Sequence, residues 1–222
     1  MDEATRRALD AQVAGCALAH QRLLADLNQL DDDACRAPSV LPRWTRGHVL
    51  NHLARNAESH VRMFVAATAG SEVEQYEGGS PARDAAIESG ANRSAKELVA
   101  DVRSSIYALE AAWASASEIT WSGSGIKSHS GGARVAITDL VLLRWCEVEV
   151  HHVDLDIGFA YRDWTPLFVR YDLDRRLTAW KARKPMGLTT LPDVVQRCSP
   201  HDRLAWLYNR ITIEGAPVPD PY

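Results

Sequence analysis

The sequence predicts an all-α protein: a four-helix bundle with a small α/β appendage at its C-terminal end. Four long stretches repeat apolar residues three and four positions apart, which is the spacing of one helix face. Mostly irregular segments join these stretches, whereas a doubly wound sheet would need strands that alternate with helices. We therefore expect the bundle to occupy residues 1–160, and a linking helix with a short subdomain to occupy residues 161–222.

The first two helices are indicated by an apolar stripe and by end signals. The stripe of the first helix consists of Leu9, Val13, Cys16, Leu23, Leu27 and Leu30. It fades at the acidic run 31–33. The second helix is predicted to begin at Thr45, a good N-cap residue, and to end near Ala69, just before Gly70.

A polar stretch that contains Gly78, Gly79 and Pro81 follows, and a third helix is predicted over residues 94–117. The next segment, 120–138, is rich in glycine and serine, so we expect a loop or a loose hairpin. The fourth helix is predicted from Thr138 or Asp139 to about Ile157.

In the C-terminal part, Pro166 fits the first turn of a fifth helix, which is expected to end near Lys184 and Pro185. The remainder is short. A strand is possible at residues 187–191, and an amphipathic piece at 203–210 precedes a proline-rich tail.

Composition excludes several classes of protein. Apolar residues at 46% and charged residues at 24% are ordinary globular usage, and a formal charge of −4 offers no basic surface for nucleic acid. No apolar run is long enough to span a membrane, and the charged N-terminus does not resemble a secretory signal. The four cysteines are scattered, as expected of reduced thiols. The sequence therefore predicts a cytoplasmic protein without a membrane or nucleic-acid partner.

The fourth helix carries an unusual polar stripe. Arg144, His151 and Asp154 fall within about 60° of Glu147 on a helical wheel, and apolar residues flank them on both sides. The opposite side, with Trp145, Glu149, His152 and Asp156, is expected to face water. Buried charges are costly unless they are paired or bind a metal, which suggests that the stripe has a function.

Glu147 and His151 lie four positions apart, so a helix would present them side by side as two ligands of a metal ion. By pattern alone such a pair is more often a surface ion pair. A third ligand is available in His52, at the edge of the buried arc of the second helix. Two imidazoles and one carboxylate leave a position open and suit zinc, although iron or nickel would also fit.

The other histidines and the remaining charges of the stripe have different expected roles. His48 is expected on the surface, and His60 is expected to be a hydrogen-bonded core residue. Because His151 and its neighbour His152 point apart, only one of them should face the core. Arg144 and Asp154 either orient the ligands or pair with each other.

Three blocks of sequence resemble one family in order: WTRGHVLNHLARN, GGSPARDAAIESGANRSAKEL and RWCEVEVHHVDLDIG. They are similar to the mycothiol-dependent maleylpyruvate isomerase family, which belongs to the DinB/YfiT-like bundle superfamily, over roughly residues 41–157. The resemblance implies a DinB-like bundle whose metal ligands are His52, Glu147 and His151. DinB-like proteins usually have histidine at the carboxylate position, so Glu147 favours the thiol-dependent branch.

The resemblance also implies an activity. In this family a metal-activated mycothiol adds reversibly to maleylpyruvate and isomerises its double bond. The stretch LAWLYNR resembles a short C-terminal helix and assigns the catalytic arginine to Arg210, although Asn209 replaces the usual glycine. Arg83 lies in the middle block and is assigned to binding of the thiol cosubstrate, although a surface capping role is equally compatible with its position.

Two other functions remain open. A mycothiol S-transferase would share the metal site and the activated thiol, but would leave the thiol attached to its product. A non-catalytic bundle would use the same polar residues as a buried ion-pair network and would bind no metal.

Overall fold

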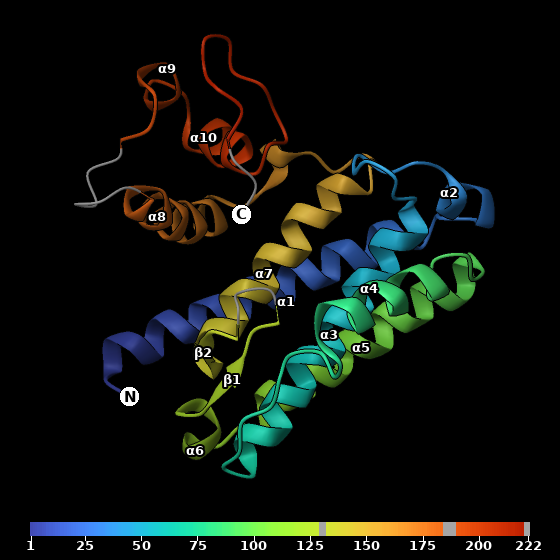
Figure 1. The fold of residues 1–222 in the computed structure, drawn as a ribbon, viewed down its shortest axis with the longest axis vertical. Helices are drawn as coiled ribbons and strands as arrows, with labels where there is room; N and C mark the ends of the chain where they lie inside the picture. Colours follow the sequence, from blue (N-terminus) through green and yellow to red (C-terminus); the bar gives the residue numbers. More distant parts are fainter. Residues whose placement is uncertain (129–131, 184–189, 220–222) are drawn as a thin grey trace. The chain divides into compact units, whose positions relative to one another are not determined.

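The computed structural model describes residues 1–128, 132–183 and 190–219, and it confirms the all-α class (Figure 1). The chain divides into two compact units, Met1–Ile157 and Gly158–Tyr222. That these units are independent domains remains a prediction. Within the described residues, no helix combines the length and the apolar character that crossing a membrane requires.

Four long helices form the first unit: α1 (Glu3–Leu27), α3 (Arg46–Thr68), α5 (Ala95–Ser115) and α7 (Ile137–Asp154). They pack in a ring in which α1 contacts α7, α7 contacts α3, α3 contacts α5, and α5 contacts α1 (Figure 1). This arrangement confirms the predicted four-helix bundle. The helix that carries the polar stripe, α7, therefore has a bundle neighbour on each of two sides.

Side-chain caps begin three of the four long helices. Asp2, Thr45 and Ser94 each accept a hydrogen bond from a backbone N–H in the first turn of the helix that follows. The predicted N-cap of the second helix, Thr45, is confirmed. Helix α7 has no side-chain cap because the chain enters it directly from a strand that ends at Ala136.

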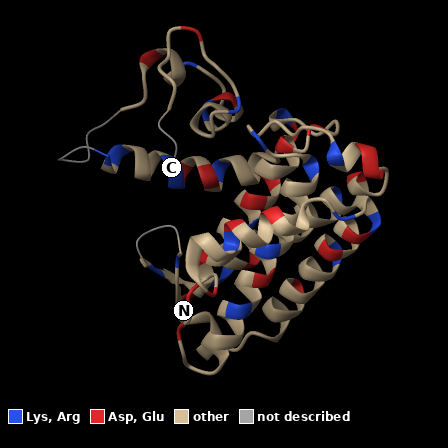
Figure 2. Ribbon diagram, turned by 45° about the vertical axis from the view of Figure 1, so that its right-hand side comes forward, with Lys and Arg blue, Asp and Glu red and all other residues tan. Residues whose placement is uncertain are grey.

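Acidic and basic residues are interspersed along the bundle helices rather than separated by sign (Figure 2). Some pair between helices: Arg55 of α3 lies 2.7 Å from Asp101 of α5, and Arg22 of α1 lies 2.9 Å from Glu149 of α7. Pairs with exposed members contribute little stability each, so the apolar core is the main source of stability.

Three short helices lie between the long ones: α2 (Asp32–Arg36), α4 (Gly79–Gly90) and α6 (Glu118–Trp121). Helix α4 packs on α3. This helix was not predicted from the sequence, because just one of its side chains, Ile87, is buried and no apolar stripe marks it.

The glycine-rich segment forms the expected hairpin, in which β1 (Ser124–Ile126) pairs antiparallel with β2 (Arg134–Ala136). The link between α3 and α4 pairs with strand β1 at the edge of this hairpin: the Gln75 N–H donates a hydrogen bond to the Ile126 carbonyl at 2.8 Å. These bonds fix the link beside β1, so that side chains of the link and of the hairpin lie near each other.

One predicted surface is wrong. Trp145, Glu149 and His152 were expected to face water, yet each is 1% exposed. The reason is that α1 packs against this side of α7, where Gly15 leaves room for the indole ring of Trp145. A helical wheel shows which side chains share a face but not how many helices surround that face. Asp156 is exposed, as predicted.

In the second unit the described regular elements are helical: η1 (Tyr161–Asp163), α8 (Pro166–Ala182), α9 (Asp193–Gln196) and α10 (Pro200–Leu207). Helices α8 and α10 pack together over a core that contains three tryptophans, Trp164, Trp180 and Trp206. Pro166 occupies the first turn of α8, as predicted. Residues 187–189 of the possible strand, and the expected helix end at 184–185, lie outside the described residues.

Asn209 follows α10 with a φ of 56°. This left-handed conformation at a helix C-terminus normally requires glycine, and asparagine is the residue that tolerates it next best. The sequence change at this position is therefore compatible with the same helix end.

Candidate metal centre

The three predicted ligands converge between α3 and α7. Nε2 of His52 lies 2.8 Å from Oε2 of Glu147 and 3.1 Å from Nε2 of His151. Nε2 of His151 lies 3.4 Å from the same carboxylate oxygen. Among the described residues these three form a cluster whose ligand atoms lie within 4.8 Å of one another. One turn of α7 supplies two donors, and α3 supplies the third.

The donor set fits a divalent cation. Two ligands about 2.0–2.1 Å from a tetrahedral ion are about 3.3 Å apart, close to the observed separations. Imidazole and carboxylate donors are those of catalytic zinc sites, which keep one position open. In the structure, two imidazole nitrogens face a single carboxylate oxygen.

Burial and mutual hydrogen bonds shift the pKa values of the three candidate ligands. Burial lowers the pKa of His52 to about 4, although its hydrogen bond to Glu147 opposes the shift. Burial would also lower the pKa of His151, but its hydrogen bonds to Asp154 and Glu147 raise it to about 9. Burial disfavours the charge on Glu147, yet hydrogen bonds from both histidines hold its pKa well below the usual range.

Asp154 contacts the candidate ligand His151, as an orienting residue would. Its Oδ2 lies 2.8 Å from Nδ1 of His151, and the carboxylate is fully buried. A proton on Nδ1 would leave Nε2 of His151 facing the cluster as a lone-pair donor.

Arg144 does not pair with Asp154, so that alternative is wrong. Its guanidinium donates to the carbonyl of Leu53 and to Oδ1 of Asn56, each at 2.8 Å, and to Nε2 of His20 at 3.1 Å. The side chain is fully buried. These bonds tie α7 to the turn of α3 that follows His52.

Arg83, on α4, lies beside the cluster. Its Nη2 is 3.2 Å from Nδ1 of His52, and its Nη1 is 2.6 Å from Oδ1 of Asp84. The guanidinium also lies 5.9 Å from the ring centre of Tyr76. The contact with His52 depends on how α4 docks on α3, which spacing along the sequence does not reveal.

Three expectations about other histidines are wrong. His48 is buried rather than exposed, because it completes the N-terminal cap of α3 with Thr45. His152 is buried against α1, so His151 and His152 both face neighbouring helices. His60 is buried as expected, but it forms no hydrogen bond with any described residue.

A pocket of about 160 Å³ opens beside the cluster. Its lining comes from α3, α7, α4, the α3–α4 link and the hairpin, and consists of His52, Asn56, His60, Gln75, Tyr76, Arg83, Lys127, Leu140, Leu143 and Glu147. It combines two candidate metal ligands with two cationic side chains and two leucines. Such a pocket suits a small anionic molecule held next to an ion.

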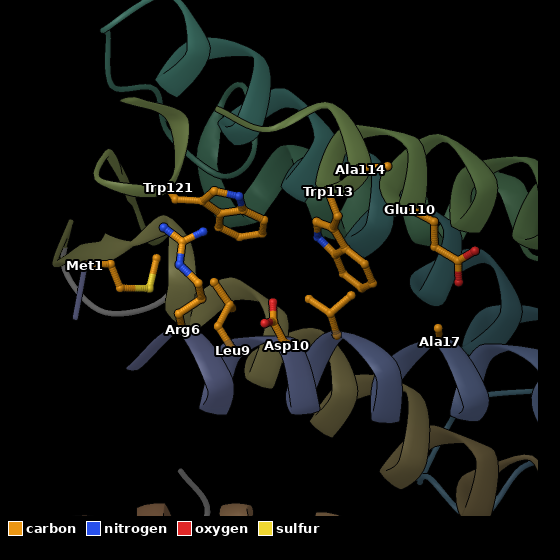
Figure 3. Close-up of a pocket in the computed structure, with 10 residues that line it drawn as sticks. Met1, Arg6, Leu9, Asp10, Ala17, Glu110, Trp113, Ala114 and Trp121 are labelled. Atoms are coloured by element: carbon orange, nitrogen blue, oxygen red, sulfur yellow. The ribbon is translucent and has the colours of Figure 1, made fainter. Parts of the chain in front are cut away.

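Another pocket, of about 310 Å³, lies between α1, α5 and α6 (Figure 3). Figure 3 shows the rings of Trp113 and Trp121 on one side of it, and Leu9 and Asp10 of α1 on the other. None of the three candidate ligands lines this pocket, so we place the chemistry at the smaller one.

The four cysteines are free, as expected, and three of them, Cys16, Cys35 and Cys146, are buried. Burial raises the pKa of the Cys16 thiol. No cysteine is among the residues that line the pocket beside the cluster. A thiol that reacts there would therefore have to come from another molecule.

Arg210, the predicted catalytic arginine, lies in the second unit just after α10. Its Nη1 donates to the carbonyl of Tyr208 at 2.6 Å, and its side chain is half-buried. Its catalytic role stays a prediction.

Comparisons with known proteins agree with this fold. Residues 16–156 match the family model of the mycothiol maleylpyruvate isomerase N-terminal domain. A crystal structure of the mycothiol-dependent maleylpyruvate isomerase is 22% identical, with a TM-score of 0.82 over 96% of this chain and 96% of that chain. A crystal structure of a histidine-to-alanine mutant is 24% identical, with a TM-score of 0.73 over 79% of this chain and 72% of that one. Among curated protein sequences, none matches.

Proposed function

The chain belongs to the mycothiol maleylpyruvate isomerase N-terminal domain family, and on that premise we propose that it is a metal- and mycothiol-dependent cis–trans isomerase of maleylpyruvate or a similar maleyl-type acid. The main support is the convergence of His52, Glu147 and His151 at the edge of a cationic pocket. Zinc is the metal that this donor set favours. Four free cysteines are consistent with action in the cytoplasm.

When bound, a divalent cation lowers the pKa of a thiol at its open position, and the thiolate is the nucleophilic form. The sulfur of mycothiol adds to the activated double bond of maleylpyruvate, so that a carbon–sulfur bond forms and the π electrons move to the carbonyl oxygen as an enolate. The former double bond can then rotate. When the electrons return and the thiolate leaves, the product is fumarylpyruvate, with no change in mass.

The chain's own residues hold and orient these groups. Asp154 keeps the proton of His151 on Nδ1, so that Nε2 remains available as a ligand. We assign Arg83 to binding of the thiol cosubstrate beside His52. We assign Arg210 to a carboxylate or to the developing enolate, which its planar fork would hold by two hydrogen bonds.

The test is to mix the purified protein with zinc, mycothiol and maleylpyruvate, and to follow both absorbance and product mass. An isomerase converts the substrate without a change in mass and regenerates the thiol. A product heavier by one mycothiol would instead identify an S-transferase. His52→Ala and His151→Ala should both lose zinc while circular dichroism shows an intact bundle, and full zinc occupancy in both variants would refute the ligand assignment.

A further inference from the structure

The pocket beside the candidate metal centre is bordered by two helices. His52 and His60 of α3 line it, together with Leu140 and Glu147 of α7. Eight residues of α3 separate His52 from His60, which corresponds to about 12 Å of helix. His60 therefore borders the same pocket as two of the candidate ligands, about two turns further along α3.

His60 is a buried polar group of this lining. Its side chain is 1% exposed, and neither ring nitrogen bonds to any described residue. Burial lowers its pKa to about 3, and the nearby cations Arg144 and Lys127 add to the shift. The ring is thus neutral and has a donor and an acceptor available to a molecule in the pocket.

The surroundings of His60 indicate what it would bind. Lys127 lines the same pocket, as does Gln75 on the α3–α4 link, whose backbone pairs with β1. Leu140 and Leu143 add apolar surface to the lining. A lining with several polar groups and an apolar surface suits a small molecule that carries more than one oxygen-bearing group.

The size of the pocket suits a small molecule. A volume of about 160 Å³ corresponds to roughly five water molecules. We therefore place the electrophile, a small acid, in this pocket.

We propose that His60 is a specificity-determining residue: its neutral imidazole donates a hydrogen bond to the carboxylate at the end of the electrophile remote from the metal, and Lys127 supplies the matching charge. This inference rests on the proposed function for the identity of the reaction. The binding step itself requires neither mycothiol nor turnover. An acid without the remote carboxylate would leave His60 unpaired and would bind less tightly.

The experiment compares two unreactive acids of equal length on the zinc-loaded full chain. Adipate carries a carboxylate at both ends, and hexanoate at one end only. Calorimetry on wild type should give an adipate affinity roughly tenfold or more above that of hexanoate. His60→Leu should abolish this preference without loss of zinc, and His60→Gln, which keeps a neutral donor, should restore part of it.

Thermal unfolding distinguishes binding from a structural role. Because His60 is unsatisfied, His60→Leu should leave the melting temperature unchanged or raise it. His48→Leu is the matched control: it removes a buried but hydrogen-bonded imidazole from the same helix, so it should lower the melting temperature and keep the preference for adipate. An unchanged preference in His60→Leu, an equal loss for both acids, or no preference in wild type would overturn the proposal.

The two proposals can fail separately. A protein that isomerises maleylpyruvate but shows no His60-dependent preference would refute the role of His60 alone. A protein without isomerase activity that still shows the preference would refute the proposed reaction and leave the binding role intact.

Discussion

Substitution of Asp154 should weaken metal binding although this residue is not a ligand. Its carboxylate is fully buried and lies 2.8 Å from Nδ1 of His151. Loss of such a partner from a ligating histidine typically lowers metal affinity by about 10–100-fold, or about 1.4–2.8 kcal/mol. We therefore expect Asp154→Ala to fall in this range. Asp154→Asn should fall between Asp154→Ala and wild type, because an amide oxygen still accepts the hydrogen bond.

Proton competition affects the choice of conditions. Asp154 helps to raise the pKa of His151 to about 9, so below that pH a proton must leave before a metal can bind. Asp154→Ala weakens the binding of this competing proton to His151 as well as the binding of the metal. The two changes have opposite effects on the apparent metal affinity. The full loss of affinity should appear above pH 9 and should shrink as the pH falls.

The assay is zinc titration against a competing chelator at two pH values, one above pH 9 and one near neutral. Asp156→Asn is the matched control, because Asp156 lies two positions further on and its side chain is exposed. It should bind zinc as wild type does. If Asp154→Ala above pH 9 retains wild-type affinity while circular dichroism shows a folded bundle, then Asp154 does not orient the ligand.

Three further predictions concern the bundle. Zinc at a hundredfold excess over its Kd should stabilise the protein by about 2.7 kcal/mol. Removal of zinc by a chelator should therefore lower the Tm by roughly 5–10 °C in a melting scan. An unchanged Tm would argue against a metal site. Burial lowers the pKa of His20 to about 4. The unfolded chain therefore binds a proton at this histidine more tightly than the folded chain does. As a result, the free energy of unfolding should fall as the pH drops from about 6.5 to 4. Urea titrations at the two pH values should show a loss of up to about 1.4 kcal/mol per pH unit, and a smaller loss in His20→Gln. Gly15→Ala would place a Cβ 2.1 Å from the Trp145 ring. The free energy of unfolding, measured in urea, should therefore fall by about 1–3 kcal/mol. A stabilised variant would show that α1 and α7 can move apart freely.

The convergence of the three candidate ligands could be predicted because helical spacing is local information. Glu147 and His151 are four positions apart, and any regular helix places them side by side. His52 could be selected because it borders the apolar arc of its own helix. The resemblance to the family pointed to the same residues independently.

Other features depend on packing between elements that lie far apart in the sequence. Both sides of α7 are covered, so Trp145 and His152 are buried although their spacing is typical of a water-facing side. Helix α4 has no apolar stripe, and so neither the helix nor the contact of Arg83 with His52 could be predicted. That the His60 ring forms no hydrogen bond with any described residue could not be predicted from the sequence either, because it depends on which groups surround the ring.

The position of Arg83 links occupancy of the ion site to the charge available in the pocket. A guanidinium can only donate hydrogen bonds, so it satisfies Nδ1 of His52 only while the proton of that imidazole sits on Nε2. An ion at Nε2 would require the opposite tautomer, which turns an N–H towards Arg83 and breaks this contact, while the pair of Arg83 with Asp84 stays in place. Binding of an ion would therefore free one N–H group of Arg83 from His52, and an acid in the pocket could accept a hydrogen bond from it.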